Sequence, residues 1–368
     1  GVAMEFTITR KDFASLLDSA ITVVPTKTPM PVLAYVHLSA TAGSLTVSAT
    51  DLMLAYRGTR AATVSRPGDV CVPARVLRDV VTKMPDGDVR VSVDKNRMSV
   101  RAGKGARAAG AIPVMDADQM PKIETPSGVP MLVPAATLSE LKRLTSYAMS
   151  PDDTRPWLAA VFVRPGAGSL RFVATDGNRM SVADRVVSGI VPQRGEILPA
   201  IGVQKIVIPA SGTVKVTLGR TIFFEDEAGN TWSVKSVNAT FPSYEQVIPS
   251  SSTGRITCNR AALLDALEAV VTVTRGDIPR VLVTPHAHGL RLEAESLEAG
   301  KMTDEVDATV DGDAVETTGL NGVYLREVLR SLASETVTIN TNTKMDAVVI
   351  RSPDEGDRFL GLIMPFRV

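Results

Sequence analysis

The same order of segments recurs three times along the chain, and this repeat constrains the fold more than any single motif does. Each copy opens with a polar residue and an amphipathic segment, continues with an alternating segment that ends in a turn, and then reaches a second amphipathic segment. These segments begin at Thr9, Leu45 and Val72 in the first copy, at Thr137, Leu170 and Leu198 in the second, and at Asn259, Leu290 and Leu320 in the third. The period of about 120 residues far exceeds the roughly 20–50 residues of a solenoid repeat, so each copy is long enough for its own hydrophobic core.

We therefore expect an α+β protein of three similar domains, over residues 4–124, 131–249 and 254–368. A chain of 368 residues exceeds what one hydrophobic core usually supports, which favours the same division. The expected borders fall at Pro121–Pro134 and at Ile248–Gly254, where proline or serine is frequent, as is typical of links between domains.

Local patterns predict the elements of each copy, and the stretch 72–100 shows how. Apolar residues recur at helical spacing up to Val81, and the helix breaker Pro85–Gly87 follows. Valines then alternate with polar residues from Val89 on, with a turn at Asp94–Asn96, which predicts a β-hairpin.

Two threonines are expected to cap the first helix of their copies. Thr137 with Glu140 has the spacing of a capping box, and Thr9 with Asp12 has a weaker form of it. We expect each of these helices to begin directly after its threonine.

The charge balance bears on possible partners, because 40 basic and 40 acidic residues give a net charge of zero. Affinity for a nucleic acid must then arise from where the charges lie. Apolar runs stay well short of the roughly 18 residues that a membrane span needs. Cys71 and Cys258 lie in apolar, strand-like contexts of different copies, so we expect buried free thiols in a reducing cytosol.

Sequence motifs for catalysis, metals and cofactors are absent. The chain has no Gly-rich phosphate loop, no dinucleotide-binding glycine pattern, no His-Glu-x-x-His and no Cys-x-x-Cys. His286 and His288 have no third ligand nearby in the sequence, which favours a solvated turn over a metal site. We therefore expect no catalytic residue, no metal and no cofactor.

Five segments resemble the β sliding clamp of bacterial DNA polymerase III, and with the repeat they extend the resemblance over essentially the whole chain. They are TRPWLAAVFV from Thr154, LRFVATDGNRM from Leu170, FPSYEQVIP from Phe241, LNGVYLREVL from Leu320 and LIMPFRV from Leu362. The resemblance implies a non-enzymatic processivity factor of the bacterial cytoplasm, associated with the nucleoid. It also implies that two copies join head to tail into a homodimeric ring of six like domains, with helices lining the hole and sheets outside, which slides on duplex DNA.

A ring that slides must attract phosphates without reading bases, so basic side chains have to supply a positive electrostatic field. The helices of the three copies offer Arg78, Lys142 and Lys205, together with Arg10, Lys11, Arg75, Arg143, Arg260, Arg326 and Arg330. The resemblance adds the loop residues Lys27, Arg155 and Trp157. Asp152 and Pro156 in the same loop stand where the family often has amide or aromatic groups.

The resemblance further implies a hydrophobic cleft between the second and third domains, which receives short extended peptides of the replicative polymerase, the clamp loader and repair proteins. Apolar walls and a methionine that can repack suit such ligands. The matching positions are Leu158, Thr175, Gly177, Asn178, Arg179, Met180, Pro242, Val247, Asn321, Tyr324, Ile363, Met364, Pro365, Phe366 and Arg367. Asn178 and Gln246 stand where the family commonly has histidine and arginine, and Phe366 stands where methionine or another apolar residue is common.

Opposite charges on two hairpins predict how copies of the chain meet. An exposed strand edge invites pairing with another chain, and opposite charges select which edges pair. The first repeat of one copy should therefore meet the third repeat of another. Val271 and Val273 either add an apolar centre to this joint or pack as a helix end. The basic residues are Arg97, Arg101, Lys104 and Arg107, and the acidic ones are Glu293, Glu295, Glu298, Asp304 and Glu305.

Two functions from other classes stay open at this point. An enzyme with three similar α/β domains, such as a nucleotide or sugar-phosphate transferase, would need convergent carboxylates or a phosphate loop, and the sequence shows neither. A repeat scaffold that binds proteins without DNA would fit the cleft, but it leaves the basic helices unexplained.

Overall fold

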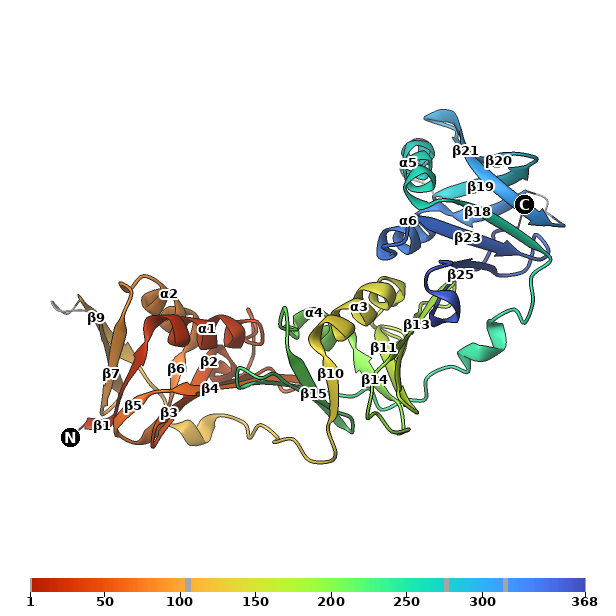
Figure 1. The fold of residues 1–368 in the computed structure, drawn as a ribbon. Coiled ribbons are helices and arrows are strands. Elements are labelled where there is room, and N and C mark those ends of the chain that lie inside the picture. The colour runs from red at the N-terminus through yellow and green to blue at the C-terminus, as the bar shows by residue number, and fades with distance from the viewer. Residues whose placement is uncertain (1, 103–106, 275–277, 314–316, 368) are drawn as a thin grey trace. The chain divides into compact units, whose positions relative to one another are not determined.

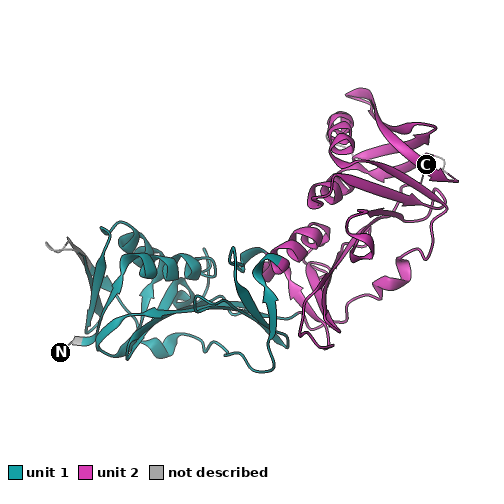
Figure 2. Ribbon diagram, in the orientation of Figure 1, with its two compact units in different colours: residues 1–136, 204–236 teal, residues 137–203, 237–368 magenta. Residues whose placement is uncertain are grey.

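The computed structural model describes residues 2–102, 107–274, 278–313 and 317–367. The chain forms two compact units, one of Gly1–Ala136 with Gln204–Ser236 and one of Thr137–Val203 with Val237–Val368 (Figure 2). The predicted limits of three domains divide the chain differently and remain a prediction. Among the described residues, no helix is long and apolar enough to cross a membrane.

The three copies share one order of elements: a strand, a helix, a run of strands, a second helix and three further strands (Figure 1). The first copy contains β1 (Val2–Thr9), α1 (Arg10–Ile21), β2 (Tyr35–Thr41), β3 (Ser44–Thr50), β4 (Leu54–Ala61), β5 (Thr63–Arg66), β6 (Gly68–Pro73), α2 (Ala74–Thr82), β7 (Asp88–Asp94), β8 (Arg97–Ala102) and β9 (Arg107–Pro113). The second contains β10 (Met131–Pro134), α3 (Ala135–Thr145), β11 (Ala160–Gly166), β12 (Ser169–Thr175), β13 (Arg179–Val186), β14 (Glu196–Pro199), α4 (Ala200–Lys205), β15 (Thr213–Thr217), β16 (Thr221–Glu225) and β17 (Asn230–Lys235). The third contains β18 (Gly254–Asn259), α5 (Arg260–Val271), β19 (Arg280–His286), β20 (Gly289–Ser296), β21 (Gly300–Gly312), β22 (Thr318–Asn321), α6 (Gly322–Ser331), β23 (Thr336–Thr341), β24 (Val348–Arg351) and β25 (Phe359–Ile363). Short 3-10 helices connect them: η1 (Pro31–Ala34), η2 (Ala117–Gln119), η3 (Ser146–Ala148), η4 (Tyr244–Val247), η5 (Thr272–Thr274) and η6 (Gly356–Arg358).

The sheets join strands of neighbouring copies. The first unit has sheets of order β5-β1-β7-β8-β9 and β10-β15-β16-β17-β4-β3-β2-β6, and the second has one of order β14-β11-β12-β13-β25-β24-β23-β18-β21-β20-β19-β22. Two of these neighbours come from different copies: β4 pairs antiparallel with β17, and β13 pairs antiparallel with β25. We call the β4–β17 pairing the first junction and the β13–β25 pairing the second junction.

Amphipathic helices pack in pairs on the sheets. Helix α1 packs against α2 and against β3 and β4, and α5 packs against α6 and against β20 and β21 (Figure 1). In α1, the residues Phe13, Leu16, Leu17 and Ala20 are buried at the spacing of one helix face, which removes their apolar surface from water. One ion pair ties each helix pair: Arg78 to Asp18, and Arg330 to Glu268.

The structure confirms the elements predicted between residues 72 and 100. Helix α2 ends at Thr82, and β7 pairs with β8 through a turn that places Val93 opposite Met98. The cap at Thr9 is also confirmed, because its Oγ1 accepts a hydrogen bond from the Asp12 amide at 3.1 Å. The thiols of Cys71 and Cys258 are free and buried, as predicted, and burial raises the pKa of each to about 11.

The capping box predicted at Thr137 is wrong. Helix α3 begins at Ala135, so Thr137 lies within its first turn. The Ala135 amide donates to the Gly212 carbonyl at 2.9 Å, which satisfies a helix-start donor without a side-chain cap. Glu140 accepts instead from Arg185 of β13, at 2.8 and 2.9 Å. Gly212 and Arg185, both distant in sequence, therefore make the hydrogen bonds that were expected within the capping box.

Candidate functional site

The turn between β12 and β13, at the second junction, is held by its own side chains. The Asp176 carboxylate accepts from the amides of Asn178 and Arg179 at 2.8 and 3.1 Å. Thr175 Oγ1 donates to the Arg179 carbonyl at 2.6 Å. Gly177 has a φ of +95°, a left-handed conformation that favours glycine. These contacts hold the exposed residues Gly177 and Asn178 in one loop conformation.

Arg179 connects this turn to helix α6. Its side chain is buried, and its Nε donates to Asp176 at 3.0 Å while its Nη1 pairs with Glu327 of α6. The guanidinium lies 4.2 Å from the centre of the Tyr324 ring, within the range of a cation–π contact. Asn321 caps α6 by accepting from the amides of Val323 and Tyr324. Of the predicted residues, Arg179 and Tyr324 are therefore in contact, and Asn321 caps the helix that carries Tyr324.

The C-terminal segment runs along the same turn. Ile363 of β25 is buried opposite Arg179, and the Met364 amide donates to the Asn178 carbonyl at 2.9 Å. The Phe366 amide then donates to the carbonyl of Gly319, a residue of β22, at 2.8 Å. Met364 remains 43% exposed, so its flexible thioether is available to a ligand.

A hydrophobic cluster lies beneath these residues. Met180, Leu362, Phe241 and Tyr244 are buried in it, and Trp157 packs against it. Three further residues of the predicted cleft differ in exposure: Leu158 is buried, whereas Pro242 and Val247 are exposed. The predicted cleft residues thus divide into a buried floor and an exposed rim, both within the second unit.

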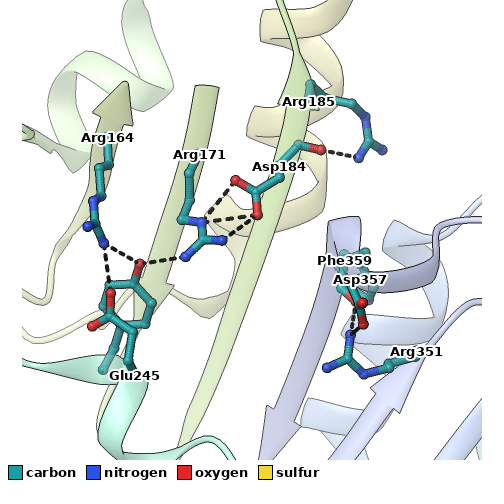
Figure 3. Close-up of polar contacts among 9 residues, drawn as sticks. Arg164, Arg171, Asp184, Arg185, Glu245, Arg351, Asp357 and Phe359 are labelled. Carbon is teal, nitrogen blue, oxygen red and sulfur yellow. Dashed lines mark hydrogen bonds and ion pairs between the residues drawn. The ribbon is translucent and has the colours of Figure 1, made fainter. Parts of the chain in front are cut away.

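Two arginines fix η4, the element that carries Val247 (Figure 3). The Tyr244 hydroxyl accepts from Arg164 Nη1 at 3.4 Å and from Arg171 Nη1 at 3.2 Å. Arg171 also donates three bonds of 2.8 to 3.0 Å to Asp184, which raise the pKa of its guanidinium. Sequence reasoning missed this network, which is built from one charged residue on each of three adjacent strands: Arg164 lies opposite Arg171, and Arg171 lies opposite Asp184.

We expect Tyr244→Phe to lower the free energy of unfolding of the second unit by about 1–2 kcal/mol, the value of hydrogen bonds to charged donors that keep other partners. Tyr324→Phe is the control, because its hydroxyl has no hydrogen bond among the described residues, and it should change stability by less than about 0.5 kcal/mol. Urea unfolding followed by Trp157 fluorescence measures both. Equal stabilities of the two variants would contradict an anchoring role of the Tyr244 hydroxyl.

Comparison with known proteins identifies the family. The model of the DNA polymerase III beta subunit N-terminal domain matches residues 4–124, and that of its C-terminal domain matches residues 245–367. Together the two matches cover more than half of the chain. The chain belongs to the β sliding clamp family of bacterial DNA polymerase III.

Individual clamps align over nearly the whole chain. The Beta sliding clamps of Caulobacter vibrioides and Synechocystis sp. are 29% and 26% identical, with 99% of this chain and 100% of each relative covered. The crystal structure of the C. crescentus clamp has a TM-score of 0.91 at 27% identity, with 99% of both chains covered. A Pseudomonas aeruginosa clamp has a TM-score of 0.90 at 26% identity, with 100% of both chains covered.

Family membership decides the class of function. Sliding clamps are non-catalytic processivity factors of DNA replication, so the chain is a DNA sliding clamp and the enzyme alternative is wrong. Its partners are DNA and the polymerase, which also excludes the scaffold without DNA.

The basic residues predicted to face DNA in this clamp differ in whether they form an ion pair within the chain. Arg78 on α2 pairs with Asp18, and Arg155 pairs with Asp152 at 3.3 Å. Lys27 in the loop after α1, Lys142 on α3 and Lys205 on α4 have no ion pair within the described ranges, although burial lowers the pKa of Lys142. Trp157 packs against the hydrophobic cluster beneath the second junction.

The residues predicted for the joint between clamp copies lie on hairpins of the first and third repeats. Arg97 and Arg101 are exposed on β8, and Arg107 begins β9, while Lys104 lies outside the described residues. Glu293 pairs with Lys301, and Glu305 pairs with Arg291. Glu298 and Asp304 have no ion pair in the described part of the chain. Val271 and Val273 are half-buried at the end of α5 and in η5. These roles remain predictions.

Proposed function

We propose that two copies of this clamp close head to tail into a ring around duplex DNA. The observation that carries this proposal is the repeated strand pairing at the two junctions. In the first two copies, β4 and β13 each pair on one edge with a strand of their own copy and on the other with the last strand of the next copy. In the third copy, Gly300–Asp307 of β21 pairs with β20 only, among the described strands.

The strand that corresponds to β17 and β25 in the first copy is β9, which lies at the end of its sheet. Pairing of β9 with β21 of another copy would continue the same pattern and cover both edges. Two copies related in this way form a heterologous contact, which closes into a ring when the rotation fits.

The charges support this choice of partner strand. At the first junction Arg60 of β4 donates to Asn230, the first residue of β17, and at the second junction Arg185 of β13 donates to Glu355. Near the corresponding position of the third copy stands Glu305, with Asp304 beside it. We therefore infer that the complementary strand is basic, as β8 and β9 are, with the residues predicted for this joint taking part.

The DNA contact that we infer is a phosphate field from Lys27, Lys142 and Lys205, with Arg78, Arg155 and Trp157 at its margin. Three lysines without ion pairs among the described residues attract phosphates and carry no sequence information. Such a field suits a ring that moves along the duplex.

We expect weak, sequence-independent and steeply salt-dependent binding to short linear duplex, because only phosphates are contacted. Lys142→Ala with Lys205→Ala should lower the slope of log affinity against log salt by about 2. Retention on circular DNA, once a clamp loader has closed the ring, should greatly exceed binding to the same DNA after linearisation, as measured by gel filtration of the complex. Tight preference for one sequence over its scrambled version would contradict the proposal.

We propose that the predicted cleft residues at the second junction bind short extended peptides of the replicative polymerase, the clamp loader and repair proteins. The buried floor, the exposed rim and the fixed Thr175–Arg179 turn support this role. Related clamps bind small molecules: the C. crescentus structure holds PEG at a region assigned to β-motif tethering, and the P. aeruginosa structure is bound to griselimycin.

Replacing Met364 and Phe366 by Ala should weaken binding of a polymerase-tail peptide by about 1–3 kcal/mol, as for interface hot spots. The substitutions remove apolar surface from the exposed Met364 and the half-buried Phe366 without changing a partner of the Arg179 ion pairs. Met30→Ala, at a 40% exposed methionine of the first unit, is the control and should bind normally. Calorimetric titration measures the affinities, and unchanged binding by the double variant would refute this assignment.

The domain limits 4–124, 131–249 and 254–368 are part of the same proposal, since each would enclose one copy of the repeat. We place the clamp in the bacterial cytoplasm at the nucleoid, where its DNA partner is found.

A further inference from the structure

The turn between β3 and β4, at the first junction, repeats the hydrogen bonds of the turn at the second junction. The Asp51 carboxylate accepts from the amides of Met53 and Leu54 at 2.9 and 2.7 Å, as Asp176 does from Asn178 and Arg179. Thr50 Oγ1 donates to the Leu54 carbonyl at 3.1 Å. The chain therefore builds the same loop twice, and the two loops carry different side chains.

The strand that follows is attached in the same way. The amide of Lys235, the last residue of β17, donates to the Met53 carbonyl at 2.9 Å, which matches the bond from Met364 to Asn178. Lys235 therefore occupies the place that Met364 occupies at the rim of the second junction.

The loop at the first junction presents apolar side chains to solvent. Leu52 is 42% exposed at a φ of +79°, where the second junction has Gly177, and Met53 is 49% exposed where the second junction has Asn178. A leucine rarely adopts a positive φ because its side chain is strained there, and such strain is concentrated at functional sites. Nothing in the fold of the turn itself requires leucine there, since glycine adopts this conformation without cost.

A cavity of about 120 Å³ opens beside this loop. It is lined by the turn, by the connecting segment Pro121–Glu124 and by Thr221, Ser233 and Lys235. Sites for whole small molecules usually measure about 300–1,000 Å³. The cavity is therefore of a size for one aliphatic side chain, with the rest of a ligand lying on the surface.

The charges at the rim select the ligand. Lys122 and Lys235 are exposed, and neither has an ion pair in the described ranges. The one carboxylate of the lining, Glu124, is engaged by the Thr221 hydroxyl at 2.7 Å. A small cavity with the exposed Leu52 and Met53 in its lining and the ammonium groups of Lys122 and Lys235 at its rim is complementary to an acidic segment that contains a leucine-type residue.

We propose that the first junction is a second docking groove, which binds an extended acidic peptide segment through one aliphatic side chain. The proposal rests on the proposed function in that it assigns the repeated turn the same kind of ligand as at the second junction. The two grooves differ in specificity, because the rim here offers lysines and a strained leucine in place of Met364 and Gly177.

Methionine methyl NMR on the full-length protein tests this, because Met53 reports on the first junction and Met364 on the second. The probe is an acetylated five-residue peptide of three aspartates and two leucines, and the control peptide has lysines in place of the aspartates. We expect saturable shifts of the Met53 signal with the acidic peptide only. Lys122→Glu with Lys235→Glu should weaken this binding at least tenfold, and Leu52→Gly should weaken it about fivefold.

The outcomes separate the two sites. Saturation at Met53 supports the second groove even if Met364 never responds to any peptide, a result that would refute only the site at the second junction. A polymerase-tail peptide that shifts Met364, with Met53 silent to the acidic peptide, overturns the second groove and leaves the proposed function intact. Equal response of Met53 to both peptides, or to protein concentration alone, also overturns it, since the occupant would then be unselected or a second copy.

Discussion

Arg101→Glu with Arg107→Glu should convert the clamp from a dimer to a monomer at micromolar concentration. The proposed joint places β8 and β9 of one copy against β21 of another, so reversal would set two carboxylates against Glu298 and Asp304. Like charges across an interface cost several kcal/mol, and we expect association to weaken at least about 100-fold, which is about 2.7 kcal/mol. Light scattering over a dilution series measures the mass directly.

Two further proteins make this test specific. Arg57→Glu with Lys215→Glu changes the net charge equally at exposed strand positions of the first unit, and this control should remain dimeric. Glu298→Arg with Asp304→Arg, mixed with the first variant, should restore a dimer by exchanging the signs at one joint. A first variant that dimerises with wild-type affinity would place the joint elsewhere.

Arg179→Met should destabilise the second unit by about 3–5 kcal/mol, the usual cost of removing one partner of a buried ion pair. The side chain of Arg179 is 9% exposed and that of its partner Asp176 is 7% exposed. Methionine fills much of the volume but leaves the Asp176 carboxylate with backbone donors only, and Glu327 of α6 with no cation. The stacking on Tyr324 is lost as well.

Arg155→Met is a matched control for this change. Arg155 pairs with Asp152 at the same sequence spacing, but the two side chains are 45% and 43% exposed, so the expected loss is below about 1 kcal/mol. Each unit contains one tryptophan, Trp232 in the first and Trp157 in the second, and urea unfolding in single-tryptophan backgrounds follows the units separately. A loss from Arg179→Met no larger than that from Arg155→Met would show that the buried pair does not hold the second unit.

The sequence predicts what depends on near neighbours. The repeat, helix α2 and the hairpin of β7 and β8 follow from apolar spacing and from local turn residues. The cap at Thr9 was predicted correctly because its partner Asp12 is three residues away. The cap at Thr137 was not, because the Ala135 amide donates to the carbonyl of Gly212, which lies just before β15 and far from Ala135 in sequence.

The site shows the same limit. A resemblance to known clamps placed Arg179 among the cleft residues, but an arginine after a hairpin turn is normally expected to be solvated. Its burial depends on Glu327 and Tyr324, which lie far along the chain on α6. The anchoring of Tyr244 by Arg164 and Arg171 likewise requires three strands and a connecting segment to be in place. No local pattern specifies such contacts.

The two junctions determine what can be cut from this chain. In the middle repeat, β17 pairs with β4 of the repeat before it, and β13 pairs with β25 of the repeat after it. A fragment of residues 131–249 would leave an edge of β13 and an edge of β17 without their partner strands, and bare edges of this kind promote aggregation. Truncation at the repeat borders therefore exposes two strand edges on the middle copy, so we expect this copy to be stable only when both of its neighbours remain attached.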